Sequence, residues 1–216
     1  GVIGYKPTYG DFDKSGILPN SPSLDTLGLM ARSIDDIQMM RNILLEEKIK
    51  IYESIDLKKF KFAFVRTPYW EEHNDECTKT ELEKFIYELT KLKYNILEEN
   101  LDDLILRSSE IHTNLSGFEF KRSIAADRIN HFEKLSEILR YGRLTDGNKM
   151  SLQTYRKLQV QLEENRLNIE KRLNKYDCII TPSAPGEALK GLEFTGSPMF
   201  NTTWTLTGMP AITLPI

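Results

Sequence analysis

Apolar residues recur at helical spacing in three stretches of the chain, and each stretch predicts a helix. The first follows a capping-box pattern, Ser33-Ile34-Asp35-Asp36, and runs from about Ile34 to Leu45. The second is marked by Leu82, Phe85, Ile86, Leu89 and Leu92. The third is capped by Ser151 and carries one apolar face, made of Leu152, Tyr155, Leu158, Leu162, Ile169 and Leu173. Charged residues on its opposite face predict a solvated outer surface: Glu163, Glu164, Glu170 and Lys171.

Short apolar runs bounded by Pro and Gly predict strands. Two of them, Lys61–Arg66 and Asn95–Glu99, flank the second helix, so this part of the chain reads strand, helix, strand. That order favours a crossover connection and a layered α/β fold. Further strands are predicted at Val2-Ile3, at residues 177–181, where the strand is expected to be buried, and at residues 211–216.

The pattern predicts one α/β domain with three segments, residues 1–45, 46–176 and 177–216. The last segment holds a loop rich in Gly and Pro at residues 183–197 and a short helix at residues 199–207. The chain opens and ends inside predicted strands. We therefore expect it to be part of a longer protein.

Composition narrows the class of protein. Lys and Arg total 29 against 32 for Asp and Glu, which argues against polyanion binding as the main activity, so no direct nucleic-acid partner is expected. The apolar runs are far shorter than the roughly 18 residues that span a bilayer, so no membrane partner is expected. Two cysteines, Cys77 and Cys178, make no disulfide framework and favour a reducing cytoplasm.

The residues contain no complete catalytic set. No Gly-x-Ser-x-Gly is present, and the glycines at 186, 191 and 196 lack the Gly-Lys-Ser/Thr of a phosphate loop. The run His73-Asn74-Asp75-Glu76-Cys77 offers metal ligands, but a solvated helix start fits it better. Glu71 and Glu72 follow a strand, yet adjacent residues on an extended segment point apart, which disfavours a catalytic pair. No metal or cofactor is implied.

Both ends of the chain resemble the amidase signature family. The N-terminal likeness is carried by Gly1 to Gly10, Ser23 to Gly28 and Ala31 to Asp36. At the other end it is carried by Asp177-Cys178-Ile179-Ile180-Thr181-Pro182-Ser183-Ala184-Pro185, and by residues 200–215 with Phe200-Asn201 and Gly208-Met209-Pro210. The resemblance implies a mixed β-sheet flanked by helices on both faces, incomplete in this chain.

What the resemblance implies for function is a serine-dependent amidohydrolase that converts a small carboxamide to acid and ammonia or amine. Such enzymes use a nucleophilic serine, a second serine on a cis peptide and a lysine base, with backbone N–H groups for the oxyanion. All of these belong before Gly1, and Lys6 lies in a structural turn. The chain is therefore expected to have no catalytic residue and to need the missing N-terminal portion of the same protein.

The resemblance also places substrate contacts in the C-terminal segment. There the loop from Ser183 and the following helix would wall the acyl-binding channel. The expected apolar wall residues, for which core packing is the alternative, are Phe194, Met199, Phe200 and Trp204.

Two other functions stay open. One is the glutamine-hydrolysing subunit of a tRNA-dependent amidotransferase, in which Arg140 or Arg143 could anchor the α-groups of glutamine. The other is a non-enzymatic scaffold derived from an amidase, in which the helix from Ser151 to about Asn174 docks a partner through an exposed apolar stripe.

Overall fold

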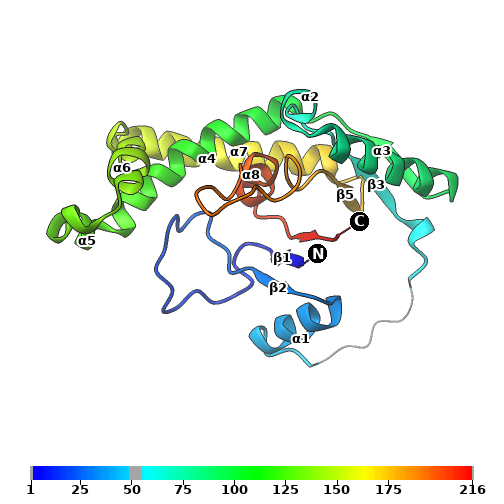
Figure 1. Ribbon diagram of the computed structural model, residues 1–216, viewed down its shortest axis with the longest axis horizontal. Helices are drawn as coiled ribbons and strands as arrows, with labels where there is room; N and C mark the ends of the chain where they lie inside the picture. Colours follow the sequence, from blue (N-terminus) through cyan, green and yellow to red (C-terminus); the bar gives the residue numbers. More distant parts are fainter. Residues whose placement is uncertain (1, 49–54, 216) are drawn as a thin grey trace. The chain divides into compact units, whose positions relative to one another are not determined.

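The computed structural model describes residues 2–48 and 55–215, which form helices and short strands (Figure 1). Gly1 of the N-terminal motif and Ile216 of the last predicted strand lie outside these ranges. The chain divides into two compact units by its internal contacts. The first unit takes residues 1–51, 110–163 and 204–216, and the second takes residues 52–109 and 164–203. A single domain over residues 1–216 stays a prediction.

Strands and helices are distributed over both units. The first unit holds β1 (Ile3–Lys6), β2 (Leu29–Ala31), α1 (Ile34–Leu44), α5 (Ala125–Asn130), η2 (Phe132–Lys134), η3 (Leu139–Arg143), α6 (Leu144–Asn148) and β6 (Ala211–Thr213). The second unit holds η1 (Leu57–Lys59), β3 (Lys61–Phe64), α2 (Trp70–His73), α3 (Glu76–Lys91), β4 (Asn95–Glu98) and β5 (Cys178–Ile180). Three helices contribute residues to both units: α4 (Asp102–Ser123), α7 (Leu152–Leu173) and α8 (Met199–Leu206). Within the described ranges every helix is too short or too polar to cross a bilayer.

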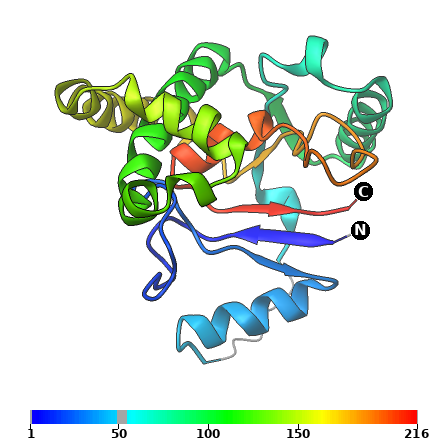
Figure 2. The same cartoon turned by 60° about the vertical axis from the view of Figure 1, so that its left-hand side comes forward.

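The sheet of the first unit is antiparallel, with β1 between β2 and β6 (Figure 2). Gly4 pairs with Met30 on one side and with Thr213 on the other, so the first and last strands of the chain are neighbours. Beyond β1 the Tyr9 N–H donates to the Gly208 carbonyl at 2.9 Å. Gly208 has φ +72°, and a Cβ there would lie 3.1 Å from the Tyr9 Cβ, so glycine suits this close approach.

Helix α1 begins at the predicted cap. The Ser33 Oγ accepts the Asp36 N–H at 3.1 Å and donates to the Asp36 carboxylate at 2.7 Å. This confirms the helix, although the carboxylate contacts the Ser33 hydroxyl rather than its backbone. Ile37 on α1 packs with Ile3 and Leu29 of the sheet.

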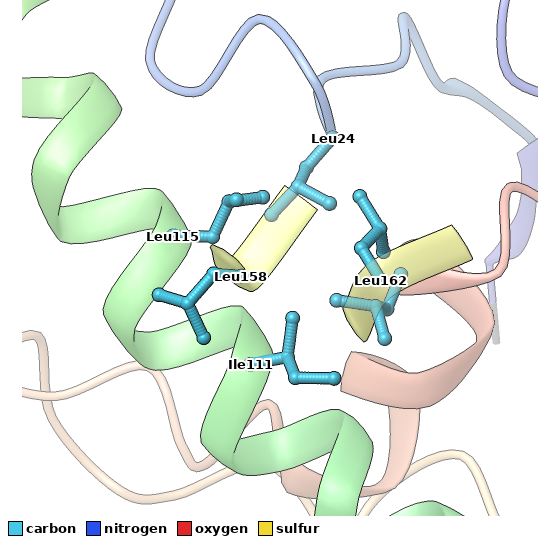
Figure 3. Close-up of a cluster of buried hydrophobic side chains, with 6 residues drawn as sticks. Leu24, Ile111, Leu115, Leu158 and Leu162 are labelled. Atoms are coloured by element: carbon cyan, nitrogen blue, oxygen red, sulfur yellow. The ribbon is translucent and has the colours of Figure 1, made fainter. Parts of the chain in front are cut away.

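Helices α4 and α7 meet through leucines in the core of the first unit (Figure 3). Leu24 of the loop before β2 contacts this cluster, whose buried members are Leu24, Ile111, Leu115, Leu158, Leu162 and Leu206. Burial of each such side chain stabilises the fold by about 1.5–3 kcal/mol. The third predicted helix is thereby confirmed, including its cap, because the Ser151 Oγ accepts the Thr154 N–H at 3.1 Å.

A buried carboxylate, Glu119 on α4, holds the loop that precedes β2. It accepts hydrogen bonds from the Ser21 hydroxyl at 2.6 Å, from the Ser23 N–H at 3.0 Å and from the Ser23 hydroxyl. From α7 the Tyr155 hydroxyl donates at 2.7 Å. Burial, together with the Glu119 carboxylate, raises the pKa of Tyr155, so its phenol remains a donor. Glu119 thus ties the loop, α4 and α7 together within the first unit.

The sheet of the second unit is parallel, in the order β4-β3-β5. The predicted strand-helix-strand order is confirmed, since α3 connects β3 to the parallel β4. Ala63 and Phe64 on the central strand are almost fully buried. The prediction of a buried strand at residues 177–181 is wrong: Cys178 is exposed and Ile179 and Ile180 are only half-buried, because β5 is an edge strand of this sheet.

Glu99, at the end of β4, is a second carboxylate held by several donors. Arg172 donates to it through Nε at 3.2 Å, Lys175 through Nζ at 2.9 Å and the Tyr176 hydroxyl at 2.9 Å. The guanidinium of Arg172, followed by Lys175, lowers the pKa of Glu99 to about 2. The ionised form of Glu99 is therefore favoured in the folded protein.

Replacing Glu119 by Gln should destabilise the fold. The amide would place N–H donors against hydroxyl and backbone donors in a buried position, which costs about 1–3 kcal/mol. Urea unfolding of the Glu119→Gln protein should therefore show a lower midpoint, whereas Glu110→Gln, on the exposed side of the same helix, should leave it within about 0.5 kcal/mol. Equal midpoints for the two variants would contradict the role given to Glu119.

Glu99 should make stability fall in acid. Because its pKa in the folded state, about 2, lies below the ordinary 4.5, the ionised carboxylate stabilises the fold above about pH 4.5. This contribution is lost as the pH falls from 4.5 toward 2. Urea midpoints measured across that window should depend on pH less steeply in Glu99→Gln than in the native protein. Glu110→Gln, at an exposed position on α4, serves as the control and should keep a slope close to the native one.

Candidate functional site

The first unit contains a cavity of about 260 Å³. Its wall is formed by the end of β1, the loop before β2, helix α4, the π-helical turn η3 and helix α8. Four of the lining side chains are titratable: Lys6, Asp25, His112 and Arg143. The others are mainly hydroxyl or amide groups with one leucine: Asn20, Ser21, Leu24, Thr26, Ser116 and Thr205. The cavity is therefore polar and rich in groups that carry positive charge.

Lys6 lies at the end of β1, where the chain leaves the sheet. Its ammonium donates to the Pro7 carbonyl at 3.2 Å and to the Met209 carbonyl. Burial lowers the pKa of Lys6. Since an ammonium has three N–H donors, one remains without a partner among the described residues.

Arg143 enters the cavity from η3, a π-helical turn over Leu139–Arg143. Such turns are rare and occur often at functional sites. The guanidinium lies 5.7 Å from the centre of the Phe120 ring, and no hydrogen bond or ion pair joins it to another described residue. Burial lowers the pKa of Arg143, against the opposing effects of Asp146 and Asp25.

His112 on α4 faces the same cavity. Burial lowers its pKa, and the positive charge of Arg143 lowers it further, so the imidazole tends to be neutral. No motif in the sequence singles out His112. The structure brings it to Lys6 and Arg143, which lie more than 100 positions before it and about 30 after it in the chain.

Asp25 is the carboxylate of the cavity wall. Its Oδ2 accepts the backbone N–H groups of Asn20 and Ser21, each at 2.8 Å. These bonds hold residues 20–25 in a compact turn. Glu119 binds the same loop at Ser21 and Ser23. Asp25 therefore contributes both to the loop and to the charge of the cavity.

The four predicted wall residues have different surroundings. In the second unit Phe194 is 61% exposed on the loop, Met199 is half-buried at the start of α8, and Phe200 is buried with its ring 5.9 Å from that of Tyr69. In the first unit Trp204 is buried, and its Nε1–H has no hydrogen-bond partner among the described residues.

Glu71 and Glu72 do not lie on the extended segment that the sequence predicted. Glu71 and Glu72 were expected on an extended segment but lie on the short helix α2. The Trp70 N–H donates to the Thr67 carbonyl at 3.2 Å in the turn that leads into this helix, and the His73 N–H donates to the Tyr69 carbonyl at 3.0 Å. Both carboxylates are exposed, and Lys79 binds that of Glu71 at 3.3 Å.

Three further candidates from the sequence are the spaced glycines, a metal site and the two arginines. Gly186, one of three regularly spaced glycines, packs on Asp75: a Cβ there would lie 1.7 Å from the Asp75 carboxylate. No cluster of three metal-ligating side chains occurs in residues 2–48 and 55–215. Of the two arginines considered as anchors, Arg140 pairs with Glu133 at 2.9 Å, whereas Arg143 faces the cavity.

Curated relatives match this chain over all or part of its length. A glutamyl-tRNA(Gln) amidotransferase subunit from Fusobacterium nucleatum subsp. nucleatum is 26% identical over 259 residues, covering 100% of this chain and 52% of that protein. An indoleacetamide hydrolase of Allorhizobium ampelinum is 25% identical over 126 residues, covering 58% of this chain and 27% of that protein. The chain spans about half the length of the curated relatives that it matches throughout.

A solved structure has the same fold. The structure described as a crystal structure of amidase superposes with a TM-score of 0.84 and 25% identity, covering 100% of this chain and 51% of that one. The family model for amidases matches residues 1–216. The α/β prediction and the resemblance read at both ends are thus confirmed, and the chain belongs to the amidase signature family.

Proposed function

We propose that the intact protein is a serine-dependent amidohydrolase that converts a small carboxamide to acid and ammonia or amine. The observation that carries this proposal is the match of the amidase family over residues 1–216. An indoleacetamide hydrolase among the relatives supports the reaction class. The reaction would be attack by a serine on the amide carbonyl, loss of the amine and hydrolysis of the acyl-enzyme.

The nucleophile and its base are proposed to lie outside these 216 residues, in the N-terminal portion of the same protein. The family places them before the motif that begins at Gly1, and the coverage of about half of each full-length relative fits that division. Lys6 does not serve as the base in this proposal, since its ammonium is bound to the Pro7 and Met209 carbonyls. The chain then supplies sheet strands and channel walls rather than reacting groups.

The proposed substrate wall consists of Phe194, Met199, Phe200 and Trp204. Phe194 and Met199 offer accessible apolar surface. Phe200 and Trp204 are buried, so they would act by fixing α8 and with it the side chains next to the substrate. Apolar walls of this kind select among acyl groups and change the rate by modest factors.

A second candidate is the glutamine-hydrolysing subunit of a tRNA-dependent amidotransferase, acting with partner subunits. It is favoured by relatives of that name that match the whole chain. The two candidates are separated by substrate, because an amidotransferase subunit would release ammonia from glutamine and leave simple aryl amides intact.

A non-enzymatic scaffold is less well supported. It requires a continuous apolar stripe on the exposed side of α7. The exposed large apolar residues of that helix are Leu152, Val160 and Leu167, about two turns apart. Charged residues, Glu163 among them, interrupt the surface between them.

The 216-residue chain by itself should not hydrolyse amides, whereas the intact protein should. The reason is that the proposed serine and lysine are absent from the shorter chain. Ammonia release from a panel of small amides and from glutamine, followed through a second purification, tests this. Turnover by the 216-residue chain that survives the second purification would contradict the division of roles.

Phe194→Ala in the intact protein should lower kcat/KM for its amide substrate by about tenfold, the range expected for loss of one apolar contact. Leu192→Ala is the matched control, because Leu192 lies in the same loop and is 99% exposed. Its kcat/KM should stay within about twofold of the native value. Equal effects of both substitutions would remove Phe194 from the substrate wall.

A further inference from the structure

We propose that a helical arm of the first unit, residues 125–143, is the surface through which two copies of this protein associate. The arm contains α5, η2 and η3, and the chain then returns to α4 at α6 (Figure 1). No residue of the arm is buried, although Ile124 before it and Leu144 after it are. The inference concerns assembly and does not depend on amide hydrolysis.

The base of the arm is fixed by a close approach of two helices. A Cβ on Gly147 of α6 would lie 2.4 Å from the Gly117 carbonyl oxygen on α4, and a Cβ on Gly117 would lie 2.9 Å from the Asp146 Cβ. Only glycine allows the two backbones to approach in this way. Because no side chain lies between them, the two ends of the arm have one packing arrangement, and a partner meets a surface that is already formed.

A cluster around Arg140 connects the two helical turns of the arm. The guanidinium carbon lies 5.9 Å from the centre of the Phe132 ring and 5.3 Å from that of Tyr141. The same guanidinium pairs with Glu133 at 2.9 Å. These contacts join η2 to η3, so the aromatic side chains of both turns belong to one surface, and the ion pair adds no net charge to it.

The arm exposes large apolar side chains that have no core to pack into. Ile129, Ile138 and Tyr141 are each at least 68% exposed, and Phe132 is also exposed. An exposed group of this kind marks a surface that binds another molecule. Specific protein interfaces use roughly 20–30 residues on each partner, and the arm supplies nearly that number. We therefore expect a dimer that dissociates on dilution.

The charges of the arm select a second copy as the partner. Asp127 and Glu137 are exposed acids, Lys134 is an exposed base and Arg128 is a half-buried one. No side-chain hydrogen bond or ion pair joins these four to the described part of the chain. In a two-fold interface the same patch lies on both sides, so a patch with balanced charges is complementary to itself. A strongly acidic or basic partner would instead meet like charges at half of these groups.

Sedimentation velocity of the intact protein at a series of concentrations tests the arm. The native protein should sediment as a dimer that dissociates on dilution. Ile138→Asp should raise the dissociation constant at least tenfold, because it places an unpaired charge in the apolar part of the interface. Leu18→Asp is the matched control, since Leu18 is 70% exposed and Ile138 is 80% exposed in the same unit. Its dissociation constant should stay within about twofold of the native value.

Charge exchange gives a second readout that loss of folding would not imitate. Glu137→Lys leaves the four charges with an excess of two positive ones, and Lys134→Glu leaves an excess of two negative ones. Each variant alone should dimerise more weakly than the native protein, and added salt should strengthen its association by screening the repulsion. An equal mixture of the two variants should restore the dimer, because each arm then meets the opposite charge.

Three outcomes would overturn the proposal. The first is a native protein that stays monomeric at every concentration. The second is a dimer that Ile138→Asp leaves intact, as expected if the N-terminal portion of the protein forms the interface. The third is a monomer that binds vesicles of phosphatidylcholine and phosphatidylglycerol through Ile138, which would assign the arm to a membrane surface. Amide turnover enters none of these measurements, so failure of the proposed hydrolysis would leave them interpretable.

Discussion

The first unit depends on one buried carboxylate. Glu119 receives hydrogen bonds from Ser21, Ser23 and Tyr155, and so fixes the loop before β2 to two helices. The same loop carries Leu24 into the leucine core and Asp25 into the cavity wall. A buried charge is stable only when it is fully hydrogen-bonded, which makes this arrangement sensitive to the loss of any one donor. The order of the core and the shape of the cavity therefore have a common origin.

Local features could be predicted from the sequence because their causes are local. The cap at Ser33, the cap at Ser151 and the strand-helix-strand order around α3 each follow from residues close together in the chain. Burial of β5 was predicted wrongly, because an apolar run gives no information about whether a strand is central or at the edge. An apolar run of this length gives the same strand prediction for a central strand and for an edge strand.

The cavity could not be predicted for a different reason. Lys6, Asp25, His112 and Arg143 come from four separate parts of the chain, and no spacing rule links them. The sequence predicts a turn at Lys6, contains no motif that singles out His112, and gives no basis for choosing between Arg140 and Arg143. In the structure Glu133 pairs with Arg140, whereas the π-helical turn η3 places Arg143 in the cavity wall. Neither feature can be predicted from local sequence.

The pairing of β1 with β6 has a consequence for how the protein is made. Gly4 lies next to Thr213, so the partner of β1 on that side is synthesised roughly 200 residues later. At about 5–20 residues per second a ribosome needs on the order of 10 to 40 s to supply it. During that interval one edge of the first strand is open to pairing with other chains. Newly made chains would then be most vulnerable to misassociation, and most dependent on chaperones, before synthesis ends.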